Sequence, residues 1–204
     1  LDFDGDLYGR FMCIEFLRYI RPTQTFRNLN TDVGSVIASA TGTGALSVEV
    51  DSAARIDGEL HFEHLVKQGE GALILTGANT VHVYDVQDGL LFATTNNSLY
   101  ASTVNVYDGG VVSLANGTTN TLVNLHEGGE LYLAETTNVS LQRGLKFLGN
   151  STISGSGRLS MTTSEFGVQN LTVTLKDTTV ALTQNGTFAQ KGTIRGEVNS
   201  TLII

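Results

Sequence analysis

The sequence predicts an all-β protein whose residues 44–204 form a β-solenoid, a right-handed parallel β-helix. Apolar and polar residues alternate with period two through many short segments rich in β-branched residues. Turns containing glycine precede these segments, at steps of 13 to 21 residues between Gly44 and Gly157. Each coil of a solenoid buries its inward residues only when neighbouring coils stack on it, so a loose internal repeat of this kind is typical of the fold.

The clearest repeat aligns residues 106–114 with residues 125–133, at a step of 19 residues. Glycines such as Gly110 and Gly129 open the alternating segments, and glycine adopts the positive φ of sharp corners without strain. A β-sandwich is the alternative, since it also consists of short strands separated by turns. The internal repeat, the aromatic content of 7% and the single cysteine favour the solenoid.

Residues 1–30 differ in composition from the rest of the chain. They contain the only proline, Pro22, and six of the fifteen aromatic residues. A turn at residues 6–9, a strand-like segment at 11–17 and the Arg21-Pro22 pair, which leads to Phe26, follow one another closely. This segment resembles the C-terminal part of the riboflavin kinase module of bacterial bifunctional riboflavin kinase/FAD synthetases. We interpret residues 31–43 as a linker between this segment and the solenoid.

The resemblance implies a short β-hairpin fragment of a riboflavin-kinase-like barrel. It implies that Arg21, Pro22 and Phe26 belong to a loop beside the flavin pocket, and that riboflavin or FMN and Mg-ATP are the ligands of a complete module. The family's catalytic Glu and its Pro-Thr-Ala-Asn segment lie upstream of the part that matches. We therefore assign no catalytic residue and no cofactor to this chain, because phosphoryl transfer depends on positioning and charge neutralisation.

Residues 65–80 resemble the strand repeat of autotransporter passenger domains. From Lys67 to Thr80 they follow the order Lys–x–Gly–x–Gly–x–Leu–x–Leu–x–Gly–x–Asn–Thr, after an apolar residue. Such passengers are β-helices on bacterial surfaces, usually adhesins or structural stalks. The resemblance implies a surface or secreted scaffold with a protein or glycan as its ligand. The apolar last residues, 202–204, read as an interrupted strand, so we expect a fragment that is truncated at its C-terminus.

Charge and composition exclude several classes. A net charge of −8 and a pI near 4.8 argue against a general nucleic-acid binder. No run approaches the ~20 apolar residues of a membrane helix, so we expect no membrane insertion in this segment. A single cysteine excludes an internal disulfide framework and a cysteine-based zinc site.

The histidines and acidic residues are the candidates for chemistry. His61 and His64 are three apart, which predicts opposite faces of a strand, and neither has zinc-site spacing with other ligands. Asp108 and Glu127 align in the 19-residue step, and polysaccharide-active β-helices use clustered carboxylates. We favour a turn-forming role for these acidic residues, since Asp before Gly is good turn chemistry.

Seven Asn-x-Ser/Thr sequons occur, including those at Asn116, Asn138 and Asn150. An excess of sequons is typical of glycosylated secreted proteins. It also arises where Asn and Thr share turns and strand faces, and we favour this second interpretation.

The sequence thus predicts a non-catalytic, adhesin-like scaffold at a cell surface or in secreted form, with an unknown protein or glycan ligand and no metal. The alternative is a fragment of a cytoplasmic riboflavin kinase. A third hypothesis is a polysaccharide-active β-helix that uses Asp108 or Glu127.

Overall fold

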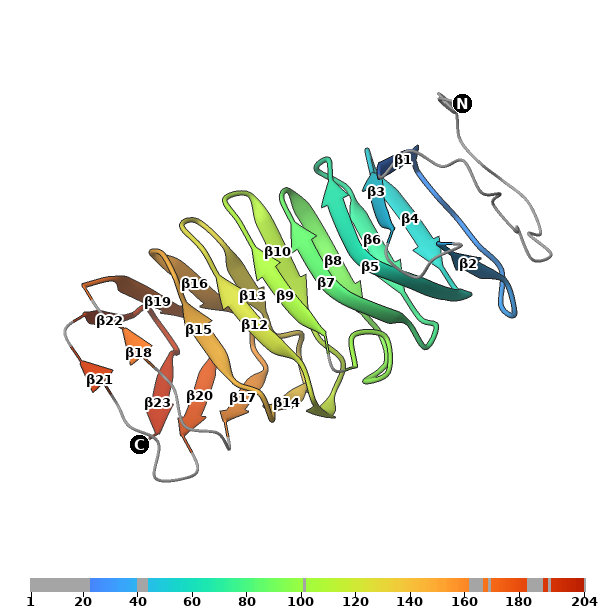
Figure 1. Ribbon diagram of the computed structural model, residues 1–204. Helices are drawn as coiled ribbons and strands as arrows, with labels where there is room; N and C mark the ends of the chain where they lie inside the picture. The colour runs from blue at the N-terminus through green and yellow to red at the C-terminus, as the bar shows by residue number, and fades with distance from the viewer. Residues whose placement is uncertain are drawn as a thin grey trace.

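The computed structural model describes residues 23–39, 44–100, 102–161, 167–168, 170–182, 189–190 and 192–203. All regular elements in these ranges are β-strands, and all their pairings are parallel. The chain winds into stacked rungs that follow one another from the N-terminal to the C-terminal end (Figure 1). The predicted β-solenoid is confirmed, and the β-sandwich alternative is wrong because a sandwich is built from antiparallel sheets.

Sheet A forms one side of the solenoid and contains eight strands. In spatial order these are β1 (Thr23–Arg27), β3 (Ala45–Glu49), β5 (Glu59–Gln68), β7 (Thr80–Val86), β9 (Thr103–Val106), β12 (Leu122–Leu125) and β15 (Leu145–Phe147), with β2 (Val36–Ala38) also paired to β5.

Sheet B forms a second side and also contains eight strands, one from each turn of the solenoid. They are β4 (Ala53–Ile56), β6 (Ala72–Leu75), β8 (Gly89–Ala93), β10 (Gly110–Ser113), β13 (Glu130–Tyr132), β16 (Ser151–Ser154), β19 (Thr172–Lys176) and β22 (Thr193–Gly196).

Sheet C closes the third side of the C-terminal turns. It consists of β11 (Gly117–Thr119), β14 (Asn138–Leu141), β17 (Arg158–Met161), β20 (Thr179–Leu182) and β23 (Thr201–Ile203). A small separate sheet pairs β18 (Gly167–Val168) with β21 (Ala189–Gln190).

The 19-residue repeat corresponds to one turn of the solenoid. Val106 of β9 pairs with Leu125 of β12, and Val112 of β10 pairs with Leu131 of β13. Both pairs are 19 residues apart, as the sequence alignment of 106–114 with 125–133 predicts. Alternation along each strand places these residues in the interior, where all four are fully buried.

The interior is filled by columns of apolar side chains, one from each rung. The sheet B column runs along Ala54, Leu73, Leu91, Val112, Leu131, Ile153 and Leu175. Tyr84 joins the sheet A column, is fully buried, and donates a hydrogen bond from its hydroxyl to the carbonyl of Ser98 at 3.1 Å. Burial raises the pKa of Tyr84, so its hydroxyl stays neutral.

Lys67 is a buried cation in an otherwise apolar column between Val48 and Val86. Its Nζ donates to the carbonyls of Gln68, Gly69 and Asp88 at 3.0, 2.5 and 2.8 Å. Burial lowers the pKa of Lys67 to about 8, an effect that the Asp88 carboxylate partly opposes. The ammonium group therefore satisfies three carbonyls at the corner between sheets A and B.

Glycines at the corners of the solenoid have two structural roles: some adopt a positive φ, and others allow close approach between rungs. At Gly89 the φ of 62° lies in the left-handed region, as the sequence predicts for corner glycines. For Gly110 and Gly129 this expectation is wrong, because the positive φ belongs to the residue before each of them, Gly109 at 79° and Gly128 at 74°. At Gly71 the φ is not positive, but an added Cβ would lie 2.6 Å from the backbone of Ser52 in the preceding rung. This second role, close approach between rungs, follows from the tight stacking of the coils.

The parallel pairing already begins within the segment that resembles riboflavin kinase. Phe26 lies in β1, pairs with Val48 of β3 and packs against the core of the solenoid. Arg21 and Pro22 lie outside the described residues. Strand β2 falls inside the range interpreted as a linker.

Candidate functional site

The candidate site is an open groove on the outer face of sheet B, over strands β13, β16, β19 and β22. Pairing in register aligns outward positions of successive rungs. One outward row runs along Glu130, Thr152, Thr174 and Arg195. A second row runs along Tyr132, Ser154 and Lys176, and Glu197 follows the end of β22.

Two adjoining hollows make up the groove. The larger, about 580 Å³, is lined by Glu130, Tyr132, Thr152, Ser154, Gly155, Thr174, Lys176, Asp177 and Glu197. The smaller, about 510 Å³, is lined by Lys176, Asp177, Arg195, Gly196, Glu197 and Val198. Each volume lies within the range of small-ligand sites. Their shared residues make the groove one continuous surface across four rungs.

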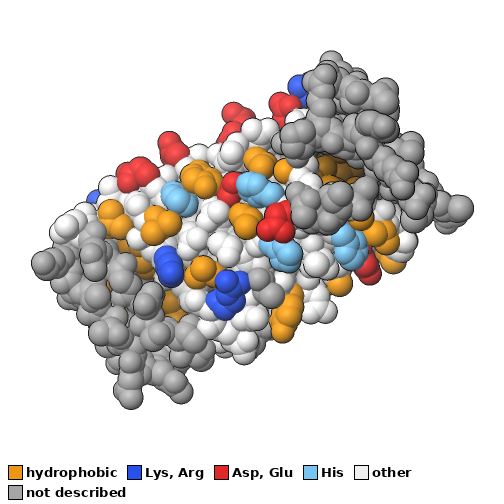
Figure 2. Space-filling model, viewed as in Figure 1, with side chains coloured by type: hydrophobic (Ala, Val, Ile, Leu, Met, Phe, Trp, Pro, Cys, Tyr) orange, Lys and Arg blue, Asp and Glu red, His pale blue; other side chains and the backbone are white. Residues whose placement is uncertain are grey.

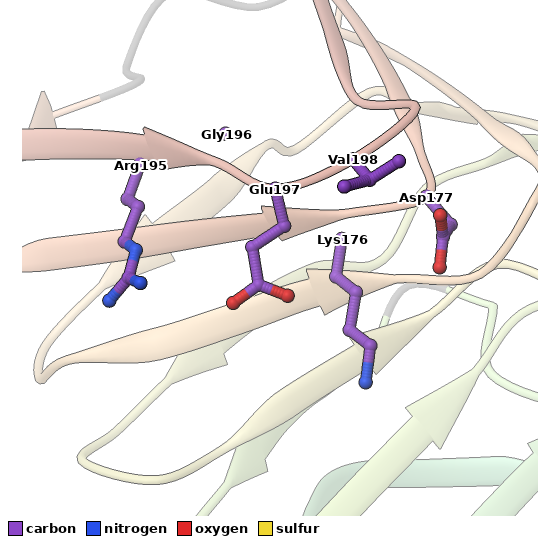
Figure 3. A pocket seen from close by; sticks show the side chains of 6 residues that line it. All are labelled: Lys176, Asp177, Arg195, Gly196, Glu197 and Val198. Atoms are coloured by element: carbon purple, nitrogen blue, oxygen red, sulfur yellow. The ribbon is translucent and has the colours of Figure 1, made fainter.

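Charged side chains in the C-terminal part of the groove project from the same face. Figure 3 shows Arg195, Glu197 and Lys176 extending to one side of their strands. Within the described part of the chain, none of these three side chains takes part in a hydrogen bond or an ion pair. Their charges are therefore available to a ligand.

Other groove residues are held in place. The Ser154 hydroxyl donates to the Glu130 carboxylate, and the Asn199 amide donates to the Asp177 carboxylate at 3.3 Å. Tyr132 pairs in register with Ser113 and Ser154 of the neighbouring strands, and 40% of its surface is exposed. The groove thus combines one aromatic ring, three carboxylates, two cations and several hydroxyls.

Gly155 at the edge of the groove has a φ of 90°, and an added Cβ would lie 2.1 Å from the carbonyl oxygen of Leu133. Any side chain here would push the turn after β16 away from the rung below. This glycine fixes the floor of the groove beside Tyr132.

The outer face of sheet A is arranged differently. His64 Nε2 lies 2.8 Å from Asp85 Oδ2, the Asn105 amide donates to Asp85 Oδ1 at 2.8 Å, and the Asn124 amide donates to Asn105 Oδ1 at 2.8 Å. Tyr107 stacks on His126, with ring centroids 4.3 Å apart. Burial and the nearby Asp85 charge raise the pKa of Tyr107. Many polar side chains on this face therefore form hydrogen bonds with polar side chains of the neighbouring rungs.

His61 and His64 both lie in β5, on the outer face of sheet A. The predicted placement of His61 and His64 on opposite faces is wrong, because Phe62 and Leu65 are both buried and the simple alternation breaks between them. Both histidines are partly exposed and pair with carboxylates, His61 with Glu59 and His64 with Asp85. Across the described ranges, no three potential ligands gather closely enough to hold a metal ion. Figure 2 shows histidine side chains among apolar ones across the middle of the visible face, with several acidic side chains along its upper edge.

Asp108 and Glu127 lie in turns of adjacent rungs, as their alignment predicts. An added Cβ on Gly128 would lie 2.1 Å from Asp108 Oδ1. The Glu127 carboxylate accepts hydrogen bonds from the backbone and the side-chain amide of Asn150, at 2.8 and 3.1 Å. These contacts match the turn-forming interpretation of the two acidic residues.

Two of the sequon asparagines, Asn116 and Asn150, link neighbouring rungs. Asn116 accepts a hydrogen bond from the backbone of Asn138 at 2.7 Å, and Asn150 accepts one from Thr172 at 2.7 Å. Since these bonds use the side-chain oxygen at corners of the solenoid, they give a structural reason for the abundance of asparagine.

The groove residues carry no motif in the sequence. Glu130 belongs to the repeat that aligns residues 106–114 with 125–133, and Lys176, Arg195 and Glu197 belong to no recognisable pattern. Their proximity depends on strand register over four rungs, which a single sequence does not reveal when the turn lengths vary.

Comparison with protein-family models finds no match, and searches of curated proteins and of solved structures return no similar chain. The described residues include no helix long and apolar enough to cross a bilayer.

Proposed function

We propose that this chain is a rigid, non-catalytic scaffold segment of a surface or secreted protein, and that it binds a partner through the groove on sheet B. The observation that carries the proposal is the contrast between a filled interior and an exposed groove with uncompensated charges. Apolar columns fill the solenoid, so the polar side chains that remain available project outward. Parallel strands stacked over many rungs hold such a surface rigidly.

A scaffold of this kind binds through many weak contacts on a preformed surface. The groove is shallow and open, which suits a partner that lies along the solenoid rather than a small molecule enclosed by the protein. Because its shape is set by paired strands rather than by loops, the groove loses little conformational freedom on binding. These properties support the proposal of a role in adhesion or display.

Retention of coated beads tests the proposal. Beads carrying the purified chain are passed over surfaces with immobilised proteins or immobilised glycans. We expect retention on at least one surface, its loss in the triple variant Tyr132→Ala, Lys176→Ala, Arg195→Ala, and its persistence in a control triple variant at the exposed positions Glu63, His82 and Tyr100. Absence of retention on every surface, or equal loss in both variants, would refute binding through the groove.

The non-catalytic part of the proposal has its own test. The chain is incubated with linear polysaccharides, and new reducing ends are measured. We expect none above the background of a heat-denatured sample. Release of reducing ends that disappears in Glu130→Gln or Glu197→Gln would make the groove an active site instead.

The riboflavin kinase alternative is tested by the fluorescence of riboflavin. A flavin site would quench this fluorescence at micromolar riboflavin, and Phe26→Ala would reduce the quenching. We expect no quenching, because Phe26 belongs to the first described rung of the solenoid and packs on its core.

A further inference from the structure

We infer that the groove on sheet B binds a linear, predominantly neutral glycan that lies along the solenoid axis with about one sugar ring per rung. This inference rests on the proposed function, since it names the ligand class of the same groove. Three properties of the groove support it: its direction, its lining and its repeat distance.

The direction of the groove favours a linear ligand. Its lining residues come from four successive rungs, β13, β16, β19 and β22. Neighbouring strands of a sheet are ~4.8 Å apart, so four rungs extend over roughly 14 Å. The groove is open to solvent along this length, so a chain can lie across the rungs.

The lining favours a ligand rich in hydroxyl groups. Thr152, Thr174 and Ser154 present hydroxyls. Lys176, Arg195 and Glu197 add donors and acceptors that no group in the described part of the chain uses, whereas Glu130 and Asp177 already accept hydrogen bonds from Ser154 and Asn199. The exposed ring of Tyr132 offers an apolar face together with a hydroxyl group. A sugar ring has the same dual character, with apolar C–H faces and a polar edge.

The repeat distance distinguishes a glycan from a peptide. A pyranose ring in an extended polysaccharide advances by nearly the distance between rungs, so successive rings meet equivalent rows of side chains. An extended peptide advances only about 3.3 Å per residue and falls out of step with the rungs after one or two residues. Peptides that join a sheet add to its edge, whereas this groove lies on the face.

The charges favour a neutral polymer over an anionic one. Glu130, Asp177 and Glu197 outnumber Lys176 and Arg195 in the groove. The whole chain carries a net charge of −8, which repels polyanions at long range. Carboxylates beside cations suit instead the bidentate recognition of vicinal hydroxyls.

Isothermal titration with defined oligosaccharides tests the inference. The probes are linear oligomers of two to six residues of glucose (β-1,4- and α-1,4-linked), mannose and N-acetylglucosamine. A galacturonate hexamer and a hexapeptide of alternating Lys and Glu serve as comparators. We expect at least one neutral series to bind, with affinity that increases up to the tetramer and then levels off because the groove spans four rungs.

Two matched variants connect binding to the groove. Tyr132→Ala should weaken the tetramer by about tenfold, whereas Tyr132→Phe should retain most of the affinity because the ring remains. Tyr100→Ala removes another exposed aromatic ring outside the groove and should leave binding unchanged. Circular dichroism of each variant confirms that the fold is intact.

The opposing outcomes are distinct. No binding of any neutral oligomer at millimolar concentration, preference for the galacturonate hexamer or the peptide, or equal losses in Tyr132→Ala and Tyr100→Ala would overturn the inference. If beads are still retained on a protein surface through the groove, the proposed function stands and only the glycan assignment fails. If a glycan binds and is cleaved, the ligand class stands and the non-catalytic proposal fails.

Discussion

The outer faces of sheets A and B have the same parallel strand arrangement but differ in how many of their charged side chains are paired. On sheet A, His64, Asp85, Asn105 and Asn124 form a hydrogen-bonded ladder across four rungs. On sheet B, the side chains of Lys176, Arg195 and Glu197 occupy similar outward positions without hydrogen bonds or ion pairs among the residues described.

This difference separates a structural face from the face that we propose binds a partner. A polar group that already has a partner gains little by exchanging it for a ligand, whereas an unpaired one gains a new contact. Since side chains of identical rows lie ~4.8 Å apart on both faces, the geometry of the fold allows either use. The choice of residues therefore decides which face offers unpaired polar groups to a partner.

The largest expected effect comes from the interior that supports both faces. Leu131 is fully buried beneath the groove. Leu131→Ala should lower the free energy of unfolding by about 2–5 kcal/mol, because a cavity replaces the lost side chain. Thr152→Ala, on the outer side of the adjacent rung, should change it by less than about 0.5 kcal/mol. Denaturant unfolding followed by circular dichroism measures both, and similar values for the two variants would contradict a filled interior.

The next largest effect on stability is expected at Gly155, which lines the groove on sheet B. Gly155 and Gly34 both have positive φ, at 90° and 82°, but only Gly155 is crowded, since an added Cβ at Gly34 meets nothing within 4 Å. Gly34→Ala should cost about 1–2 kcal/mol through its backbone conformation. Gly155→Ala should cost more, because the backbone of Leu133 must also move. Thermal melts compare them; equal costs would show that the clash relaxes freely.

The interior and the groove also differ in how well the sequence predicts them. The interior was predictable because alternation of apolar residues is a strong signal along one dimension, and residues 106–114 align with 125–133 as the register has them. The groove was not predictable, because its outward row is aligned only by strand register, through turns of unequal length. The residues of this row are 22, 22 and 21 positions apart: Glu130, Thr152, Thr174 and Arg195. The resemblances to riboflavin kinase and to autotransporter passengers stay predictions.

The pH dependence of the free energy of unfolding tests the environment of Lys67, at the corner between sheets A and B. Its pKa is lowered from an ordinary value of 10.5 to about 8, so between these pH values the unfolded chain binds more protons at this residue than the folded chain does. Stability should therefore rise with pH in that window. Relative to Lys67→Met, which lacks the titration, the native chain should gain about 1 kcal/mol between pH 7 and pH 9. Urea unfolding at both pH values measures the difference. A gain of the opposite sign would mean that the three carbonyls favour the charged form more strongly than burial opposes it.

The smallest expected changes in stability come from single polar side chains on the outer faces of sheets A and B, and they test the difference between these faces most directly. Asp85→Ala removes the carboxylate that joins His64 to Asn105 in a partly buried setting, so it should cost about 1 kcal/mol. Lys176→Ala removes an exposed cation without a partner and should change stability by less than about 0.5 kcal/mol. Binding to the groove should show the reverse order, with loss in Lys176→Ala and none in Asp85→Ala. Unfolding and titration of the same two samples give both readouts. If Asp85→Ala also reduced binding, the two faces would be coupled, and the ladder on sheet A would help to shape the groove on sheet B.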